Sequence, residues 1–326
     1  MTRRRRFARR WLASLCWPAS ASLAACLATC LATCLAGLGA SPAHAAGSNA
    51  SSRFCDRPAE INAAQQDRLL RFAAVVKQAL DRSGHGVALI ARSGLDLSRF
   101  DVRYSHAGIS LKTSPNGPWS VRQLYYACDE SRPRLFDQGM AGFLLGTDNP
   151  SVGYVSLVLL PEPEGESLAR TSLDPRLALD LLAADYSANA YAFSTRYQNC
   201  NQWVMELLAS AWGQLEPARP AREQAQRWLQ AQGYAPASIG VSHALVFAAQ
   251  FVPLIHVSDH PPDDLYALKL RISMPSSIET FVRQQSPRAE RIELCHDERQ
   301  VVVHRGWEPL GAGCQAGPGD EVVLLD

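Results

Sequence analysis

The chain has 326 residues, of which 47% are hydrophobic and 19% charged, so it has the composition of a globular protein with a sizeable core. Its 32 basic and 31 acidic residues give a formal charge of +1, and no basic patch predicts nucleic-acid binding. The sequence contains no Walker loop, dinucleotide fingerprint or Gly-x-Ser-x-Gly elbow, so it gives no support to ATP- or NAD-dependent chemistry.

The first 45 residues have the pattern of an export signal. An arginine cluster within residues 3–10 precedes a long apolar stretch that ends in small residues, Ala43-His44-Ala45. Removing residues 1–45 takes away six arginines and no acid, which leaves 26 basic and 31 acidic residues and a net charge near −5. Two alternative interpretations of this segment remain open. The chain could carry a lipid anchor on Cys26, and it could be exported by the twin-arginine route rather than the general secretory route. No later segment is apolar for long enough to span a bilayer.

Five cysteines follow the expected signal. In an oxidising compartment an odd number of cysteines predicts two disulfides and one thiol, and four paired cysteines allow three connectivities. Cys295 and Cys314 bracket an expected hairpin, which favours a bond between them. Cys55 would then pair with Cys128, leaving Cys200 as the thiol.

The segment after the signal alternates helical and strand-like patterns. Apolar residues at helical spacing predict a helix over 61–80, which Gly84 and Gly86 end. Strands are expected at 87–91, 102–112, 119–126 and 152–160. A turn signal at 114–118 makes the third of these strands the antiparallel partner of the second, which carries His106 in its middle.

The second half is richer in helical patterns. Helices are expected at 175–186, from 199 onward, and at 222–232, 241–251 and 276–284. Residues 265–272 are strand-like, and the last forty residues alternate as two or three strands that close on 322–325. We therefore expect one domain over 46–216 and a C-terminal helical and β extension over 217–326 that packs on it.

Cys200 is the candidate nucleophile because it lies where an amphipathic helix should begin. A helix N-terminus presents unpaired N–H groups and a partial positive charge, which favour a thiolate and a developing oxyanion. The preceding Asn199 and Tyr197 are the candidate substrate- or oxyanion-binding residues. The alternative for Cys200 is a buried structural cysteine, a common fate of this residue type.

His106 is the candidate base for this thiol. A thiol–imidazole pair usually needs a third polar group to orient the ring, and the following strand is where that group should lie. Alternation places Gln123 on the expected face of that strand, with Arg122 and Glu130 as weaker candidates. His256, Asp259 and His260 have metal-ligand side chains, but two prolines follow and indicate a loop, so no metal site is expected.

These two blocks resemble a known arrangement. A histidine strand, His106-Ala107-Gly108-Ile109, before a cysteine helix that opens at Asn199-Cys200 resembles the circularly permuted NlpC-type papain-like fold, which includes lecithin-retinol-acyltransferase-like proteins. The resemblance spans 87–212 and implies an α+β fold with an antiparallel sheet packed on the cysteine helix. In that group a polar residue on the next strand completes the triad; this chain has Gln123 where relatives often have glutamate or histidine.

The whole expected mature chain, including residues 197–204 and 272–279, also resembles an uncharacterised family of exported bacterial proteins, domain of unknown function 2145. That resemblance implies a periplasmic location. Together the residues and both resemblances predict a cysteine hydrolase or acyltransferase that acts on a cell-envelope amide or acyl group without a metal or organic cofactor. The alternative is a non-catalytic envelope protein that keeps the fold as a binding or assembly module.

Overall fold

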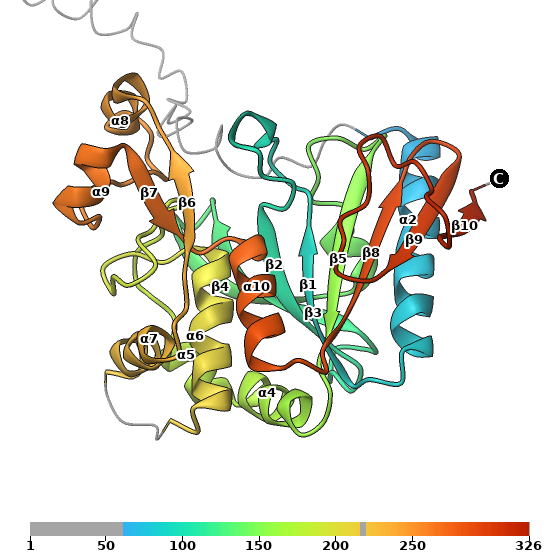
Figure 1. Cartoon of the computed structure of the whole chain (residues 1–326), viewed down its shortest axis with the longest axis horizontal. Coiled ribbons are helices and arrows are strands. Elements are labelled where there is room, and N and C mark those ends of the chain that lie inside the picture. Colours follow the sequence, from blue (N-terminus) through green and yellow to red (C-terminus); the bar gives the residue numbers. More distant parts are fainter. Residues whose placement is uncertain (1–60, 216–219, 326) are drawn as a thin grey trace, which may run out of the picture. The chain divides into compact units, whose positions relative to one another are not determined.

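A computed structural model describes residues 61–215 and 220–325, which lie within one compact unit, Ser48–Asp326 (Figure 1). An eight-stranded antiparallel sheet forms its centre, in the order β10-β9-β8-β5-β1-β2-β3-β4. The strands are β1 (Val87–Arg92), β2 (His106–Leu111), β3 (Ser120–Ala127), β4 (Arg132–Gln138), β5 (Gly153–Leu159), β8 (Glu290–His296), β9 (Gln300–Arg305) and β10 (Glu321–Leu324). This arrangement confirms the predicted α+β class and the antiparallel sheet.

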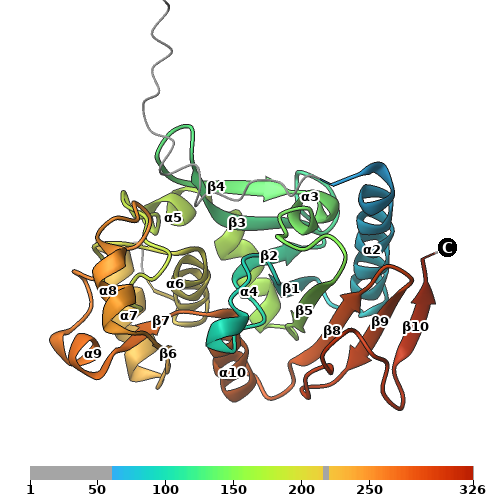
Figure 2. The same cartoon turned by 90° about the horizontal axis from the view of Figure 1, so that it is seen from above.

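Helices cover both faces of the sheet. The nine α-helices of the described residues are α2 (Ala63–Arg82), α3 (Met140–Leu144), α4 (Glu164–Leu173), α5 (Pro175–Asp180), α6 (Cys200–Trp212), α7 (Ala221–Ala231), α8 (His243–Ala249), α9 (Pro262–Ala267) and α10 (Pro275–Gln285). Seen from above, the sheet curves, with α2 and α3 on one side and α4, α6 and α10 on the other (Figure 2). No described helix is long and apolar enough to cross a membrane.

Side chains of the central strands point alternately to the two faces of the sheet and so contribute to two separate hydrophobic cores. Leu89 and Ile109 point to the α6 side and pack with Trp203, whereas Ile90 and Val121 point to the α2 side. Because successive strand residues face opposite sides, a strand buried on both faces needs apolar residues at nearly every position. All six residues of β1 and of β2 are buried.

The segment between α7 and α10 forms a small two-stranded sheet of its own. β6 (Ala237–Gly240) pairs antiparallel with β7 (Lys269–Ile272), and α8 and α9 lie between them in the chain. The predicted strand over 265–272 is half helix: Pro262 opens α9, and Leu268, with φ of 53°, ends the helix in the left-handed region before β7 begins.

Three further expectations need correction. His106 is the first residue of β2 rather than its middle, because Asp101, with φ of 57°, turns the chain and Val102 bridges only to Leu97. The predicted helix over 175–186 ends at Asp180. Four elements, α3, α4, β4 and β6, have no counterpart among the predicted helices and strands.

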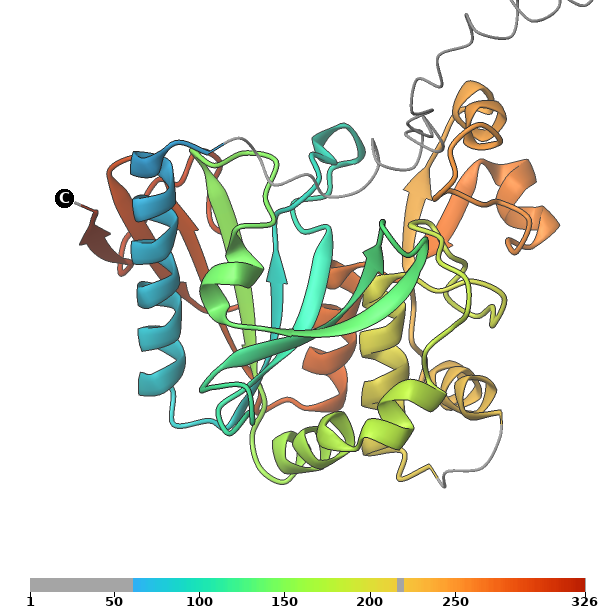
Figure 3. The ribbon, with the colours of Figure 1, turned by 180° about the vertical axis from the view of Figure 1, so that it is seen from behind.

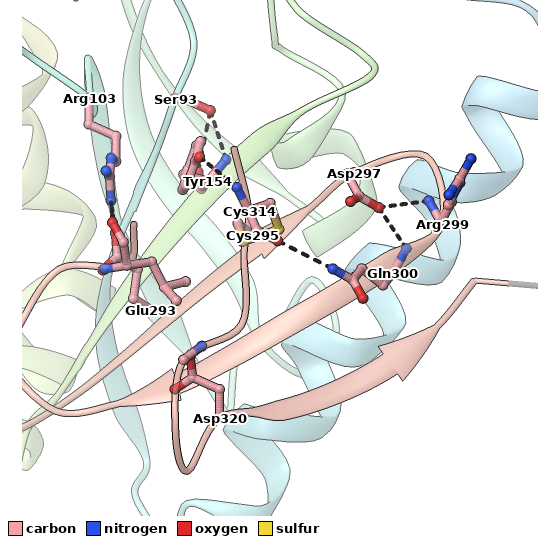
Figure 4. Close-up of a disulfide and its surroundings, with 12 residues drawn as sticks. Ser93, Arg103, Tyr154, Glu293, Cys295, Asp297, Arg299, Gln300, Cys314 and Asp320 are labelled. Atoms are coloured by element: carbon pink, nitrogen blue, oxygen red, sulfur yellow. Dashed lines mark hydrogen bonds and ion pairs between the residues drawn. A yellow bond between two sulfur atoms is a disulfide. The ribbon is translucent and has the colours of Figure 1, made fainter. Parts of the chain in front are cut away.

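The predicted bond between Cys295 and Cys314 is confirmed (Figure 4). It ties the end of β8 to the loop that leads to β10, and Gln300 donates to the Cys314 carbonyl beside it. Cys128 is also disulfide-bonded, and its expected partner Cys55 lies outside the described residues, as do the export signal and Cys26. A disulfide is consistent with an oxidising compartment.

Loss of this bond should destabilise the protein measurably. Replacing Cys314 by alanine opens a loop of 19 residues, and chain entropy predicts a loss of about 3 kcal/mol in the free energy of unfolding. Urea unfolding of the variant and the wild type, with and without a reducing agent, measures the difference. Reductant should have a much smaller effect on the variant, and equal sensitivity of both proteins would contradict the assignment.

Candidate active site

Cys200 is the first residue of α6, and its neighbours explain why the helix begins there. The Asn199 side chain accepts a hydrogen bond from the Gln202 amide at 2.7 Å, and the Asn199 carbonyl accepts from the Trp203 amide at 3.2 Å. The apolar residues of the next turns are fully buried against the sheet. The Cys200 thiol is reduced and 6% exposed, at the positive end of the helix dipole.

The contact between His106 and Gln123 fixes the tautomer of the His106 imidazole ring. The Nε2 atom lies 2.5 Å from Gln123 Oε1, and the Gln123 amide nitrogen donates to Gln138 Oε1 on β4. Because an amide oxygen only accepts, His106 Nε2 must carry the proton, and Nδ1 is then the basic atom. Figure 3 shows the long β3–β4 hairpin that supplies these two glutamines.

The environment keeps the imidazole neutral at pH 7. Burial, and secondly the charge of Arg92, lower the pKa of His106 to about 3, although the Gln123 hydrogen bond acts in the opposite direction. A thiol that used such an imidazole as its base would start in a neutral pair rather than as thiolate and imidazolium. A neutral imidazole of this kind can accept a proton at Nδ1.

Cys200 and His106 line the same cavity, which has a volume of about 220 Å³. Most of the remaining wall is apolar or aromatic: Leu95, Leu124, Tyr125, Tyr126, Tyr186, Leu254 and Ile255. Arg92 contributes a cation. A few polar groups in an apolar cleft are typical of a small-molecule site.

The two side chains reach this cavity from different faces of the sheet. His106 lies opposite Arg92 in the β1–β2 register, and its ring contacts Phe143 of α3, whereas its neighbour Ala107 packs in the core with Cys200. β2 pairs with β3 over Ile109–Leu111, so His106 lies beyond this pairing. The cavity therefore lies at the open start of β2, where groups from both faces can meet.

The other candidate residues have identifiable contacts. Asn199 caps α6 and donates to the Ala188 carbonyl at 3.2 Å, and the Tyr197 ring stacks on His256 with 4.4 Å between centroids. The weaker candidates for the third position are engaged elsewhere, Arg122 with Asp137 and Glu130 with two arginines of β4. His260 Nε2 donates to the Asn189 carbonyl at 2.8 Å, His260 Nδ1 lies 3.3 Å from Asp264 Oδ2, and Asp259 accepts from the Tyr191 amide.

A buried ionic cluster holds the loop before Cys200, and sequence reasoning missed it. Glu206, fully buried on α6, accepts hydrogen bonds from Gln198, Arg222 and Gln226. Arg222 also donates to three carbonyls of the loop, those of Ser194, Thr195 and Tyr197. The signal in the sequence was a single acid within the apolar helix run Trp203–Leu208.

Two buried histidines predict acid sensitivity. Burial lowers the pKa of His106 to about 3 and that of His296 to about 4, from an ordinary value of 6.5. The unfolded chain therefore binds protons that the folded chain does not, so stability is complete above pH 6.5 and is lost as the pH falls. Each histidine should lower the free energy of unfolding by roughly 1.4 kcal/mol per pH unit as the pH falls from about 6 to 4.

Urea unfolding at several pH values measures this slope. His106→Gln should reduce the slope by about one proton, whereas His243→Gln, at an exposed position, should keep the wild-type slope. An unchanged slope in His106→Gln would mean that the imidazole titrates as in the unfolded chain.

The fold and the site define an α+β protein with a reduced cysteine at a helix start and a buried histidine on the wall of the same cavity. The chain belongs to the family described as uncharacterised proteins conserved in bacteria, DUF2145, whose model matches residues 79–282. The matched segment includes His106, Gln123 and Cys200. No curated protein and no solved structure matches the chain.

Proposed function

We propose that the protein is an exported thiol enzyme of the permuted papain-like type that acts on a cell-envelope amide or acyl group. The observation that carries the proposal is the shared cavity of Cys200 and His106. The order of the elements, with the histidine strand before the cysteine helix and a sheet packed on that helix, supports the papain-like comparison. The Cys295–Cys314 disulfide supports export to an oxidising compartment such as the periplasm.

The geometry supports one sequence of steps. Cys200 Sγ attacks the carbonyl carbon while its proton passes to His106 Nδ1, and the carbonyl π electrons move to the oxygen. The N–H groups at the start of α6 stabilise that oxyanion. Collapse breaks the bond to the leaving group, which takes the proton from His106 and leaves a thioester on Cys200. Water or another acceptor then attacks the thioester and releases the thiol.

Alkylation kinetics test this function without a known substrate. The folded protein is treated with iodoacetamide across pH 5–10, and mass spectrometry locates the adduct, with Cys200→Ser as the control. Labelling at Cys200 with a thiol pKa below the free value of about 8.5 is expected. A Cys200 that stays unlabelled in the folded protein would contradict the thiol mechanism.

A binding function is the second candidate, favoured by a separate and larger cavity. This cavity of about 500 Å³ is lined by Arg103, Glu279 and Trp307 among others, and lacks the thiol. Four of its charged side chains pair with one another: Glu293 lies 2.9 Å from Arg103 and 3.1 Å from Arg291, and Arg291 also pairs with Glu279 at 3.0 Å. A protein that used only this cavity would keep Cys200 as an inert core residue.

A further inference from the structure

We propose that Asn201 is a positioning residue of the Cys200 site, which holds the thiol protonated and oriented until a substrate arrives. This inference rests on the proposed function and deepens it by naming how the nucleophile is regulated. It gives the residue after the nucleophile a role that opposes the helix terminus, which on its own favours the thiolate.

The Asn201 side chain contacts both elements that carry the proposed reactive groups. Its Oδ1 atom accepts a hydrogen bond from Cys200 Sγ at 3.6 Å, and its Nδ2 atom donates to the Ser105 carbonyl at 3.2 Å. Ser105 directly precedes His106, the first residue of β2, and lines the same cavity as Cys200. Asn201 is only 2% exposed. One buried amide therefore joins the start of α6 to the start of β2.

These contacts fix the orientation of the amide. An amide nitrogen only donates and an amide oxygen only accepts, so the atom that faces the Ser105 carbonyl must be the nitrogen. The same nitrogen lies 4.0 Å from Met274 Sδ, a second acceptor, just before α10. The oxygen therefore faces Cys200, and the thiol must supply the proton of the contact between them.

Asn201 differs from the other buried amide side chains next to Cys200. Gln202 donates to three carbonyls of the loop before α6, at distances of 3.0–3.3 Å, and Asn199 caps the helix. Those contacts hold the backbone in place, whereas the contact of Asn201 involves the thiol itself. Gln202→Ala therefore removes buried hydrogen bonds of the same kind and leaves the Asn201 contact in place.

A hydrogen bond donated by the thiol stabilises its neutral form. Loss of the proton would leave a thiolate against the oxygen end of the amide dipole, so Asn201 partly offsets the effect of the helix terminus. A protonated thiol also resists oxidation, which suits a reduced cysteine in an oxidising compartment. The titratable or charged groups on the cavity wall, from β1, β2, β3 and the loop before α6, are Arg92, His106, Tyr125, Tyr126 and Tyr186. They stay the same in the variants below, so a difference in thiol pKa between variants reports the substitution.

The pH dependence of alkylation in three variants tests this role. The rate of iodoacetamide labelling at Cys200 is measured across pH 5–10 for wild type, Asn201→Ala, Asn201→Asp and Gln202→Ala. Asn201→Ala removes the acceptor and should lower the thiol pKa by about one unit, which speeds labelling below the pKa about threefold because the gain in thiolate exceeds its loss of nucleophilicity. Asn201→Asp keeps the shape but adds a negative charge, so it should raise the thiol pKa by about one unit. Gln202→Ala should leave the thiol pKa unchanged.

Opposite shifts distinguish this role from a merely structural one, because both Asn201 variants lose the bond to the Ser105 carbonyl. An unchanged thiol pKa in Asn201→Ala, or shifts of the two variants in the same direction, would overturn the role of Asn201 and leave the thiol enzyme standing. Failure of folded wild-type Cys200 to label would overturn the thiol enzyme instead.

The infrared spectrum of the wild type decides if the variants do not fold or Cys200 does not label. The difference between wild type and Cys200→Ser at pH 7 identifies the S–H stretching band of Cys200. A thiol that donates to an amide oxygen absorbs at a lower frequency than ethanethiol in hexane, which has no acceptor. A Cys200 band at the frequency of ethanethiol in hexane would overturn the contact with Asn201.

Discussion

Replacing His106 by glycine should slow the alkylation of Cys200 by iodoacetamide at pH 7 about 100-fold, the usual contribution of a general base. In the proposed mechanism the neutral thiol needs a proton acceptor, and the Gln123–Gln138 chain leaves the basic atom of His106 at Nδ1. Stopped-flow or quenched labelling followed by mass spectrometry measures the rate. Gln123→Ala should have a smaller effect, about tenfold, because it frees the ring to rotate without removing the base.

Chemical rescue distinguishes a lost base from a damaged fold. The glycine variant leaves a space that free imidazole can enter, so added imidazole should restore part of the labelling rate in His106→Gly and have little effect on the wild type. A rate that falls only two- or threefold in the variant would assign Cys200 reactivity to the helix terminus alone.

Replacing Arg222 by methionine should lower the free energy of unfolding by about 3–5 kcal/mol, because Glu206 would keep a buried charge without its cation. The two side chains are 8% and 0% exposed, and Arg222 Nε lies 2.8 Å from Glu206 Oε2. Urea unfolding measures the loss. Arg227→Met on the same helix is the matched control, since its pair with Glu223 is exposed and its loss should change stability by less than about 1 kcal/mol.

A double variant tests whether the pair itself is responsible. Adding Glu206→Gln to Arg222→Met removes the uncompensated charge and should recover part of the lost stability. Additive effects of the two substitutions would contradict a direct ionic interaction. Because Arg222 also donates to the loop that leads into Cys200, the single variant should in addition slow Cys200 alkylation.

The sequence predicted those parts of the fold whose signals are local. The start of α6 follows from Asn199, which caps the helix, and from the apolar face that follows it. β1, β2 and β3 follow from apolar residues bounded by turn signals. The hairpin expected between Cys295 and Cys314 also predicted the disulfide that joins them.

The missed features depend on contacts between distant residues. β4 has charges and a proline, and only its pairing with β3 along seven residues makes it a strand. Arg222 and Glu206 lie on different helices, and no periodicity links them. The same holds for Arg92, which lies just after the strand predicted at 87–91 and which only the β1–β2 register places opposite His106.

The pairing of β5 with β8 has a consequence for how the chain folds. It joins Gly153 to His296, and β8 lies inside the sheet, between β5 and β9. The sheet therefore cannot close during synthesis until almost the whole chain has emerged, and long-range antiparallel pairing of this kind is slow. For the export that we propose, slow closure would prolong the interval in which the polypeptide is still extended, the state that a narrow translocation channel requires.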